Sequence, residues 1–183
     1  TFYSGEGDDR LIAIAKLPSS RHVFYGGAGN DHLQGGGGRD VLDGGTGDDT
    51  IYAGGGRNQI FAGHGNDWVE GGDGSSVIHT GPGRNRVKLG RGNDTLHLGT
   101  GIAHIRAGGG NTHFVPAYGG VTIVDKWAAG QVYDLTAWPQ MPVMTQTGDM
   151  VEFTLGLSIL RVLGVPAGTD LRAQMRCGAA DAP

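Results

Sequence analysis

The sequence predicts an all-β protein, a right-handed parallel β-roll followed by a small β-rich C-terminal cap. Three observations favour this fold. Glycine makes up 37 of the 183 residues, well above the ~7% of average proteins. A nine-residue pattern repeats twelve times between Ser4 and Val115, with the glycines in fixed positions of the pattern. After residue 115 both the pattern and most of the glycine disappear.

The repeating unit reads G-G-x-G-x-D-x-U-x, where U is a large apolar residue, and residues 35–43 (GGGGRDVLD) show it clearly. Glycine occupies the second and fourth positions in eleven of the twelve units, and a four-residue insertion (Ala13 to Lys16) follows the first unit. All twelve eighth positions are apolar: Leu11, Phe24, Leu33, Leu42, Ile51, Ile60, Val69, Ile78, Val87, Leu96, Ile105 and Phe114. Such constant phase indicates a repeat architecture.

A nine-residue unit has room for a six-residue turn and a three-residue strand. In the strand x-U-x, one side chain points inward and two point outward. The glycines permit positive φ and let successive turns stack closely. If consecutive units alternate between two facing sheets, one coil takes 18 residues, and units two apart stack about 4.8 Å apart. We therefore expect two parallel sheets around a thin core.

The sixth positions of the units are rich in acidic residues and form two columns in this arrangement. One edge of the roll carries Asp9, Asp31, Asp49, Asp67, Asn85 and Ala103, and the other carries His22, Asp40, Asn58, Ser76, Asp94 and Thr112. Carboxylates stacked at about 4.8 Å repel each other by roughly 3–4 kcal/mol at an effective dielectric constant near 20. Such a row needs cations between its members.

Carboxylates and the free carbonyls of glycine turns form a hard oxygen site, which suits Ca²⁺ rather than zinc or copper. The predicted metal ligands are Asp9, Asp31, Asp40, Asp49, Asn58, Asp67, Asn85 and Asp94. The first edge has three acid–acid pairs and the second has none. We therefore expect about three to seven ions, bound more firmly on the edge of Asp31.

Over residues 4–115 the chain resembles the RTX (repeats-in-toxin) family, whose nonapeptide repeat binds calcium in a parallel β-helix. The resemblance implies that Ca²⁺ lies between turns of one edge, held by the sixth-position aspartates and turn carbonyls. It also implies a secreted, extracellular protein exported by the type I machinery, with the repeats C-terminal to a toxin, protease, lipase or epimerase domain. A calcium-binding module that folds on binding extracellular Ca²⁺ is the expected function.

The change in composition at residue 116 predicts two domains, the repeat roll over 1–115 and a β-rich capping and secretion segment over 116–183. A solenoid cannot end on an exposed apolar coil, so a cap is required. Strands are expected at 121–127, 131–138, 150–155 and 158–165, and a short helix near 169–175, with its start around Asp170. This stretch resembles the segment that follows RTX repeats, through Asp125, Trp127, Gly130 and Asp134-Leu135-Thr136.

Several function classes are disfavoured. A net charge of −4 argues against a nucleic-acid partner. No apolar run reaches 18 residues, so no transmembrane segment is expected. The sequence has no H-E-x-x-H, no G-x-S-x-G and no phosphate-loop motif, which predicts a non-catalytic module.

Two alternatives stay open. Arg21, Arg39 and Arg57 share the fifth position on one edge, and stacked guanidinium groups suit an anionic polymer. The chain would then be an anionic-polysaccharide-binding or substrate-positioning module, similar to the calcium modules of alginate epimerases. A third interpretation places an enzyme site in the cap, at Asp125, Asp134 or Asp149.

Overall fold

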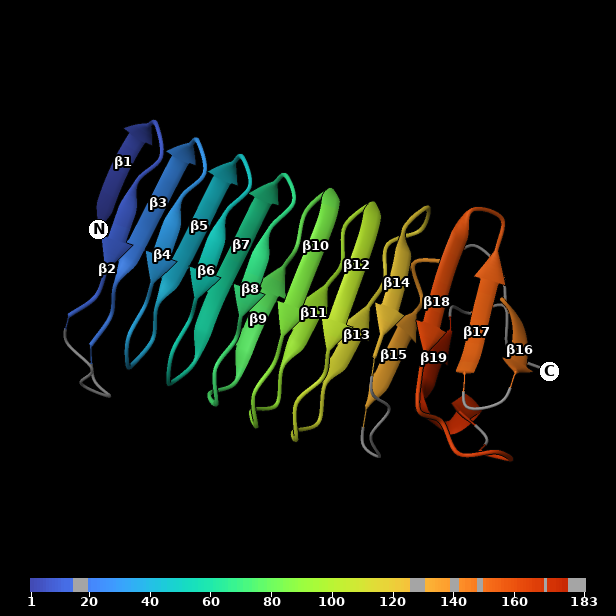
Figure 1. Ribbon diagram of the computed structural model, residues 1–183. Helices are drawn as coiled ribbons and strands as arrows, with labels where there is room; N and C mark the ends of the chain where they lie inside the picture. Colours follow the sequence, from blue (N-terminus) through green and yellow to red (C-terminus); the bar gives the residue numbers. More distant parts are fainter. Residues whose placement is uncertain (15–19, 126–130, 139–141, 148–149, 170, 178–183) are drawn as a thin grey trace.

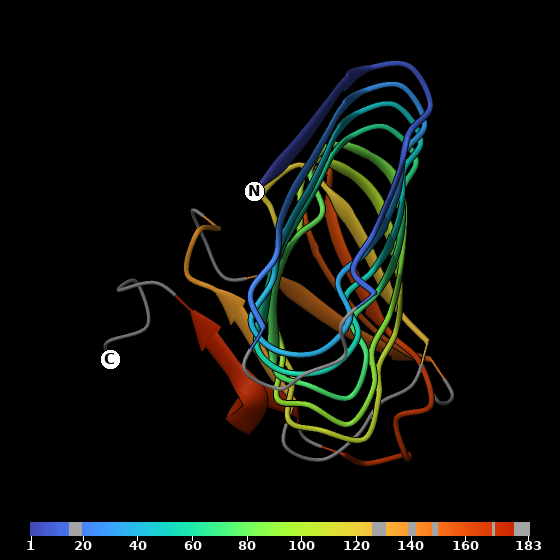
Figure 2. The same cartoon turned by 90° about the vertical axis from the view of Figure 1, so that its left-hand side faces the viewer.

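The computed structural model describes residues 1–14, 20–125, 131–138, 142–147, 150–169 and 171–177. In it the chain forms a parallel β-solenoid whose coils stack side by side along one axis (Figure 1). Viewed along that axis, the coils overlie one another as flattened loops, with one sheet on each long side (Figure 2). The predicted all-β, roll-like fold is confirmed.

Two sheets make up the solenoid. The first contains, in spatial order, β1 (Phe2–Glu6), β3 (Val23–Ala28), β5 (Val41–Thr46), β7 (Asn58–His64), β9 (Ser76–His79), β11 (Thr95–His97), β13 (His113–Val115), β15 (Val132–Leu135) and β19 (Met175–Cys177). The second contains β16 (Val143–Thr147), β17 (Met150–Leu155), β18 (Ser158–Val162), β14 (Val121–Val124), β12 (Gly101–Arg106), β10 (Gly83–Lys88), β8 (Trp68–Glu70), β6 (Thr50–Tyr52), β4 (His32–Gln34) and β2 (Arg10–Ile12).

The strand register confirms a coil of 18 residues. Leu42 pairs with Ile60 in the first sheet, and Ile51 pairs with Val69 in the second. In the first coil the spacing is wider, because the insertion follows it: Leu11 pairs with Leu33. Eleven of the twelve eighth-position side chains are buried between the sheets, and Leu11 in the first coil is partly buried. The thin core expected from one large residue per unit is therefore present.

The core continues beyond the last repeat. β14 and β15 pair in parallel with β12 and β13, so both sheets run across residue 116. Tyr133 stacks on Phe114 with ring centroids 5.1 Å apart. The buried Trp138 donates a hydrogen bond from Nε1 to the carbonyl of Pro116, at 3.3 Å. The end of the glycine pattern is thus not the end of the sheets.

At its C-terminal end the second sheet changes direction. β18 joins β14 in parallel, whereas β17 and β16 follow in antiparallel order. Phe153 and Leu160 on these strands are fully buried. The four predicted strands correspond to β14, β15, β17 and β18, while β16 and β19 were not predicted.

The predicted helix corresponds to a short 3-10 helix at Leu171–Gln174, which leads directly into β19. Trp127, Gly130, Asp149 and Asp170, which were singled out from the sequence, lie outside the described residues. In the described part of the chain, no helix is long and apolar enough to cross a membrane.

The turn glycines are required by close stacking, and one adjacent pair shows this directly. Gly54 has a φ of +82°, and a Cβ added to it would lie 2.0 Å from the carbonyl oxygen of Gly36 in the preceding coil. Its neighbour Gly55 is exposed, and an added Cβ would lie 4.0 Å from the same oxygen. The second position of a unit therefore excludes side chains, whereas the third does not.

We expect Gly54→Ala to lower the free energy of unfolding by about 2 kcal/mol or more, because alanine is strained at positive φ and its methyl group meets backbone. Gly55→Ala is the matched control and should change that free energy by less than about 0.5 kcal/mol. Chemical unfolding in saturating calcium measures both. Equal effects of the two substitutions would contradict the stacking described here.

Candidate metal centre

The sixth-position side chains lie inside the turns, out of contact with solvent. On the first edge Asp31, Asp49, Asp67 and Asn85 are each at most 2% exposed, and on the second edge Asp40, Asn58 and Asp94 are at most 3% exposed. Asp9, in the first coil, is partly buried. Burial of ionisable carboxylates is costly unless each oxygen finds a partner.

One carboxyl oxygen of each residue has a partner in the preceding coil. Along the first edge, Oδ1 accepts a hydrogen bond from the backbone N–H of the sixth residue one coil earlier. The pairs are Asp31 with Asp9 at 2.8 Å, Asp49 with Asp31 at 2.8 Å, Asp67 with Asp49 at 3.0 Å and Asn85 with Asp67 at 2.9 Å. The structure thus joins five expected ligands in one column, with Asp9 beside Asp31 as predicted.

The second edge has the same contacts but is interrupted. Asp40 Oδ1 accepts from the backbone N–H of His22 at 2.7 Å and lies 2.9 Å from His22 Nδ1. Asn58 Oδ1 accepts from the N–H of Asp40 at 2.9 Å, and Asp94 Oδ1 accepts from the N–H of Ser76 at 2.8 Å. Ser76 separates Asn58 from Asp94, so this edge does not bring its three expected ligands into one continuous column.

The second carboxyl oxygen of these aspartates has no hydrogen-bond partner. The buried, unpartnered Oδ2 atoms are those of Asp9, Asp31, Asp40, Asp49, Asp67 and Asp94. An unpaired buried acceptor of this kind is strongly unfavourable. Six such atoms in equivalent positions indicate that a positively charged group belongs in these turns.

In three of these turns the space around the unpartnered oxygen also contains a carbonyl oxygen of the next coil. A Cβ added to Gly44 would lie 2.3 Å from Asp49 Oδ2 and 2.4 Å from the carbonyl oxygen of Ala62. The first-position glycines Gly26 and Gly35 stand in the same relation to Asp31 and Asp40. Acceptor oxygens from two coils therefore converge on a small space that the absence of a side chain leaves open.

Burial raises the pKa of the carboxyl groups in this column. The pKa of Asp49 rises to about 7, mainly through desolvation, with further contributions from the charges of Asp67, Asp31 and Asp48. Desolvation raises the pKa of Asp94 to about 6. The pKa values of Asp31 and Asp67 are also raised, again mainly by desolvation. In the metal-free roll these carboxyl groups therefore keep a proton to higher pH than an ordinary aspartate does.

The donor set fits a calcium ion. In the described residues no group of three or more His, Cys, Asp or Glu side chains comes together, so side chains alone do not form a site. Carboxylate and backbone carbonyl oxygens together make an all-oxygen set, which Ca²⁺ prefers and Zn²⁺ does not. The carbonyls of the first-position residues were not singled out from the sequence, although the glycines at Gly26, Gly35 and Gly44 are a signal that marks them.

The fifth positions differ between the two edges. On the first edge Asp8, Asn30, Asp48 and Asn66 each accept the backbone N–H of the fifth residue in the following coil, at 2.7–3.0 Å. On the second edge the N–H groups of Arg39 and Arg57 instead donate to the carbonyls of Ser20 and Gly38, at 3.0 Å. The arginine side chains are thereby free of any role in joining the coils.

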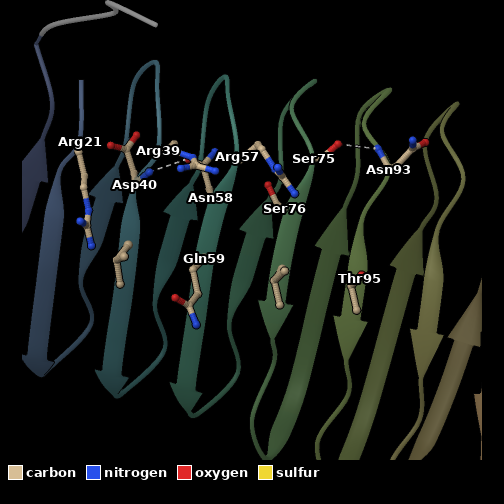
Figure 3. Close-up of a pocket in the computed structure, with 12 residues that line it drawn as sticks. Arg21, Arg39, Asp40, Arg57, Asn58, Gln59, Ser75, Ser76, Asn93 and Thr95 are labelled. Atoms are coloured by element: carbon tan, nitrogen blue, oxygen red, sulfur yellow. Dashed lines mark hydrogen bonds between the residues drawn. The ribbon is translucent and has the colours of Figure 1, made fainter. Parts of the chain in front are cut away.

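Arg21, Arg39 and Arg57 project in a row from successive coils (Figure 3). They line a groove of about 600 Å³ together with Gln59, Ser75 and Asn93. All three arginines are exposed, and no described carboxylate forms an ion pair with them. Asp40 also lines the groove, so its three arginines outnumber its one carboxylate.

Comparison with known proteins places the repeats in a family. The family model of the RTX calcium-binding nonapeptide repeat matches four times, at residues 25–60, 43–78, 61–96 and 70–105. A search of curated proteins finds no match. Among solved structures, the extracellular lipase LipA from Serratia marcescens is 15% identical with a TM-score of 0.38, over 95% of this chain and 37% of the lipase chain. The chain thus spans little more than a third of that lipase. Residues 25–105 of this chain are therefore similar to the RTX calcium-binding nonapeptide repeat.

Proposed function

We propose that this chain is a non-catalytic calcium-binding module that folds on binding extracellular Ca²⁺ and serves as the folding and secretion module of a larger secreted protein. The observation that carries this proposal is the set of six buried Oδ2 atoms without a partner, each inside a turn. The predicted aspartate ligands all belong to this set. Residues 1–115 would form the calcium-binding roll and residues 116–183 its cap.

The chain's own residues prepare each turn for a cation. In the aspartate turns after the first coil, Oδ1 accepts a hydrogen bond from a backbone N–H of the preceding coil, as Asp49 Oδ1 does from the N–H of Asp31, and this contact fixes the direction of Oδ2. In the turns of Asp31, Asp40 and Asp49 the first position is glycine, so no side chain fills the space where Oδ2 meets a carbonyl oxygen of the next coil. When bound, Ca²⁺ supplies the positive charge that these oxygens require.

This arrangement makes calcium binding part of folding. A site assembled from two adjacent coils does not exist in the unfolded chain, so the free energy of binding contributes to the free energy of folding. Extracellular calcium modules have dissociation constants of roughly 10⁻⁴–10⁻³ M. At low cytosolic calcium the roll would remain unfolded, which suits export, and it would fold outside the cell.

The antiparallel strands at the C-terminal end support the role of a cap. The inner side chains of the last coils need a cover, because a solenoid end otherwise exposes apolar surface. β17 and β18 supply the buried residues Val151, Phe153, Leu160 and Val162 at this end. Secretion through this segment is part of the proposal and follows from the family.

The raised pKa values predict that protons can replace calcium in part. Asp49, with a pKa of about 7, and Asp94, with a pKa of about 6, bind protons more tightly in the folded roll than in the unfolded chain, where the usual value is 3.8. The metal-free roll should therefore be most stable at acid pH and lose stability as the pH rises through 6–7.

In chelator we expect a melting transition at pH 5 and none at pH 8, where the chain is unfolded, so the stabilisation caused by calcium should be larger at pH 8. Asp49→Ala should reduce this calcium-induced stabilisation at pH 8, whereas Glu6→Gln, at an exposed acid that is not a sixth-position residue, should not. Calorimetry at both pH values measures these effects. A calcium response that is independent of pH and of Asp49 would contradict the proposed function.

A second candidate function is binding of an anionic polysaccharide, favoured by the groove of Arg21, Arg39 and Arg57. Their guanidinium groups repeat with the coil spacing of about 4.8 Å. Three like charges without a described acidic partner lower their mutual repulsion by binding an extended polyanion. The module would then position a polymeric substrate for another domain.

Binding of a polyuronate to the calcium-loaded chain should be salt-sensitive and should weaken at least about tenfold in Arg39→Ala/Arg57→Ala, because charge-assisted contacts are lost. Arg84→Ala removes an exposed fifth-position arginine on the opposite edge and serves as the control. Titration calorimetry at two salt concentrations measures both. Equal weakening by Arg84→Ala would show non-specific charge attraction rather than binding in the groove.

A further inference from the structure

Two buried asparagines occupy sixth positions where the repeat calls for aspartate. Asn58 is the first residue of β7 on the second edge, and Asn85 lies within β10 on the first edge. They are 3% and 1% exposed, as deeply buried as the aspartates of their columns. Their side chains therefore face the same interior of the turn.

Oδ1 of each asparagine accepts a backbone hydrogen bond from the preceding coil, as Oδ1 of the aspartates does. Asn58 Oδ1 accepts the N–H of Asp40 at 2.9 Å (Figure 3), and Asn85 Oδ1 accepts the N–H of Asp67 at 2.9 Å. The contact between coils is thus unchanged. Only the second atom of the side-chain head group differs.

The amide nitrogen of each asparagine donates hydrogen bonds to backbone carbonyls of its own turn. Asn58 Nδ2 donates to the carbonyls of Gly55 at 3.1 Å and Ala53 at 3.4 Å. Asn85 Nδ2 donates to the carbonyls of Thr80 at 3.0 Å and Gly81 at 3.1 Å. In the aspartate turns the corresponding atom is an unpartnered Oδ2.

Rotation of the amide does not convert these turns into calcium sites. If Asn58 turned its oxygen toward the carbonyls, its NH₂ group would face the N–H of Asp40, donor against donor. The same holds for Asn85 and the N–H of Asp67. The backbone of the neighbouring coil thus fixes which atom of the amide points into the turn. A cation in that turn would face two N–H hydrogens.

We propose that Asn58 and Asn85 close their turns without an ion, the amide group taking the place of calcium. The proposal rests on the calcium-binding function proposed above. It removes the two asparagines from the set of calcium ligands expected from the sequence and confines the ions to the turns of the sixth-position aspartates. The calcium series then ends at Asn85 on the first edge, and on the second edge Asn58 and Ser76 separate the aspartate turns of Asp40 and Asp94.

The test is a count of bound ions by native mass spectrometry of the full chain, with calorimetric titration. Asn58→Asp and Asn85→Asp each convert the amide into the arrangement of the aspartate turns, so each should bind one ion more than the wild type. Asn30→Asp makes the same charge change at an exposed fifth position and should leave the count unchanged.

Asn58→Ala distinguishes a closing amide from a ligand. It should lower the melting temperature in saturating calcium and leave the number of bound ions unchanged. Loss of an ion in Asn58→Ala, or an unchanged count in both Asn→Asp variants, would overturn this proposal while leaving calcium binding intact. A wild-type chain that binds no calcium would overturn the proposed function and this inference together.

Discussion

The roll depends on a conflict between buried oxygen atoms. In the turns of Asp31, Asp40 and Asp49 a carboxyl oxygen and a backbone carbonyl of the next coil converge, and both are acceptors. Neither can satisfy the other, so the turn is favourable only with a proton, a donor group or a cation between them. The pKa of Asp49 rises to about 7 for the same reason, because a negative charge buried among these oxygens is unfavourable.

The other features of the molecule follow from this arrangement. Coils must approach closely for their oxygens to share one space, and glycines such as Gly54, at positive φ against the preceding coil, permit this approach. Close turns leave room for one large side chain per strand, so the core is thin and long. That core then needs continuation into Tyr133 and closure by β16–β18, which carry no repeat.

The sequence was sufficient for those features that the nine-residue period determines. A constant period fixes which residues stack, and so the column of Asp9, Asp31, Asp49 and Asp67 was predicted correctly. Whether a sixth-position asparagine directs its oxygen or its nitrogen into the turn depends on the N–H of the neighbouring coil. The sequence pattern alone does not predict this orientation. β16 was missed because its five residues, VMTQT, are all exposed and lack an apolar alternation. The position of the ions remains a prediction.

The most direct test of the central claim is far-UV circular dichroism at pH 8 during a calcium titration from chelator to about 10 mM, with Mg²⁺ as the control. If the oxygens of the aspartate turns require Ca²⁺, a cooperative transition from coil to strand should occur with calcium and not with magnesium. A complete strand signal already present in chelator would contradict the account, because the core and the cap would then hold the roll without a cation.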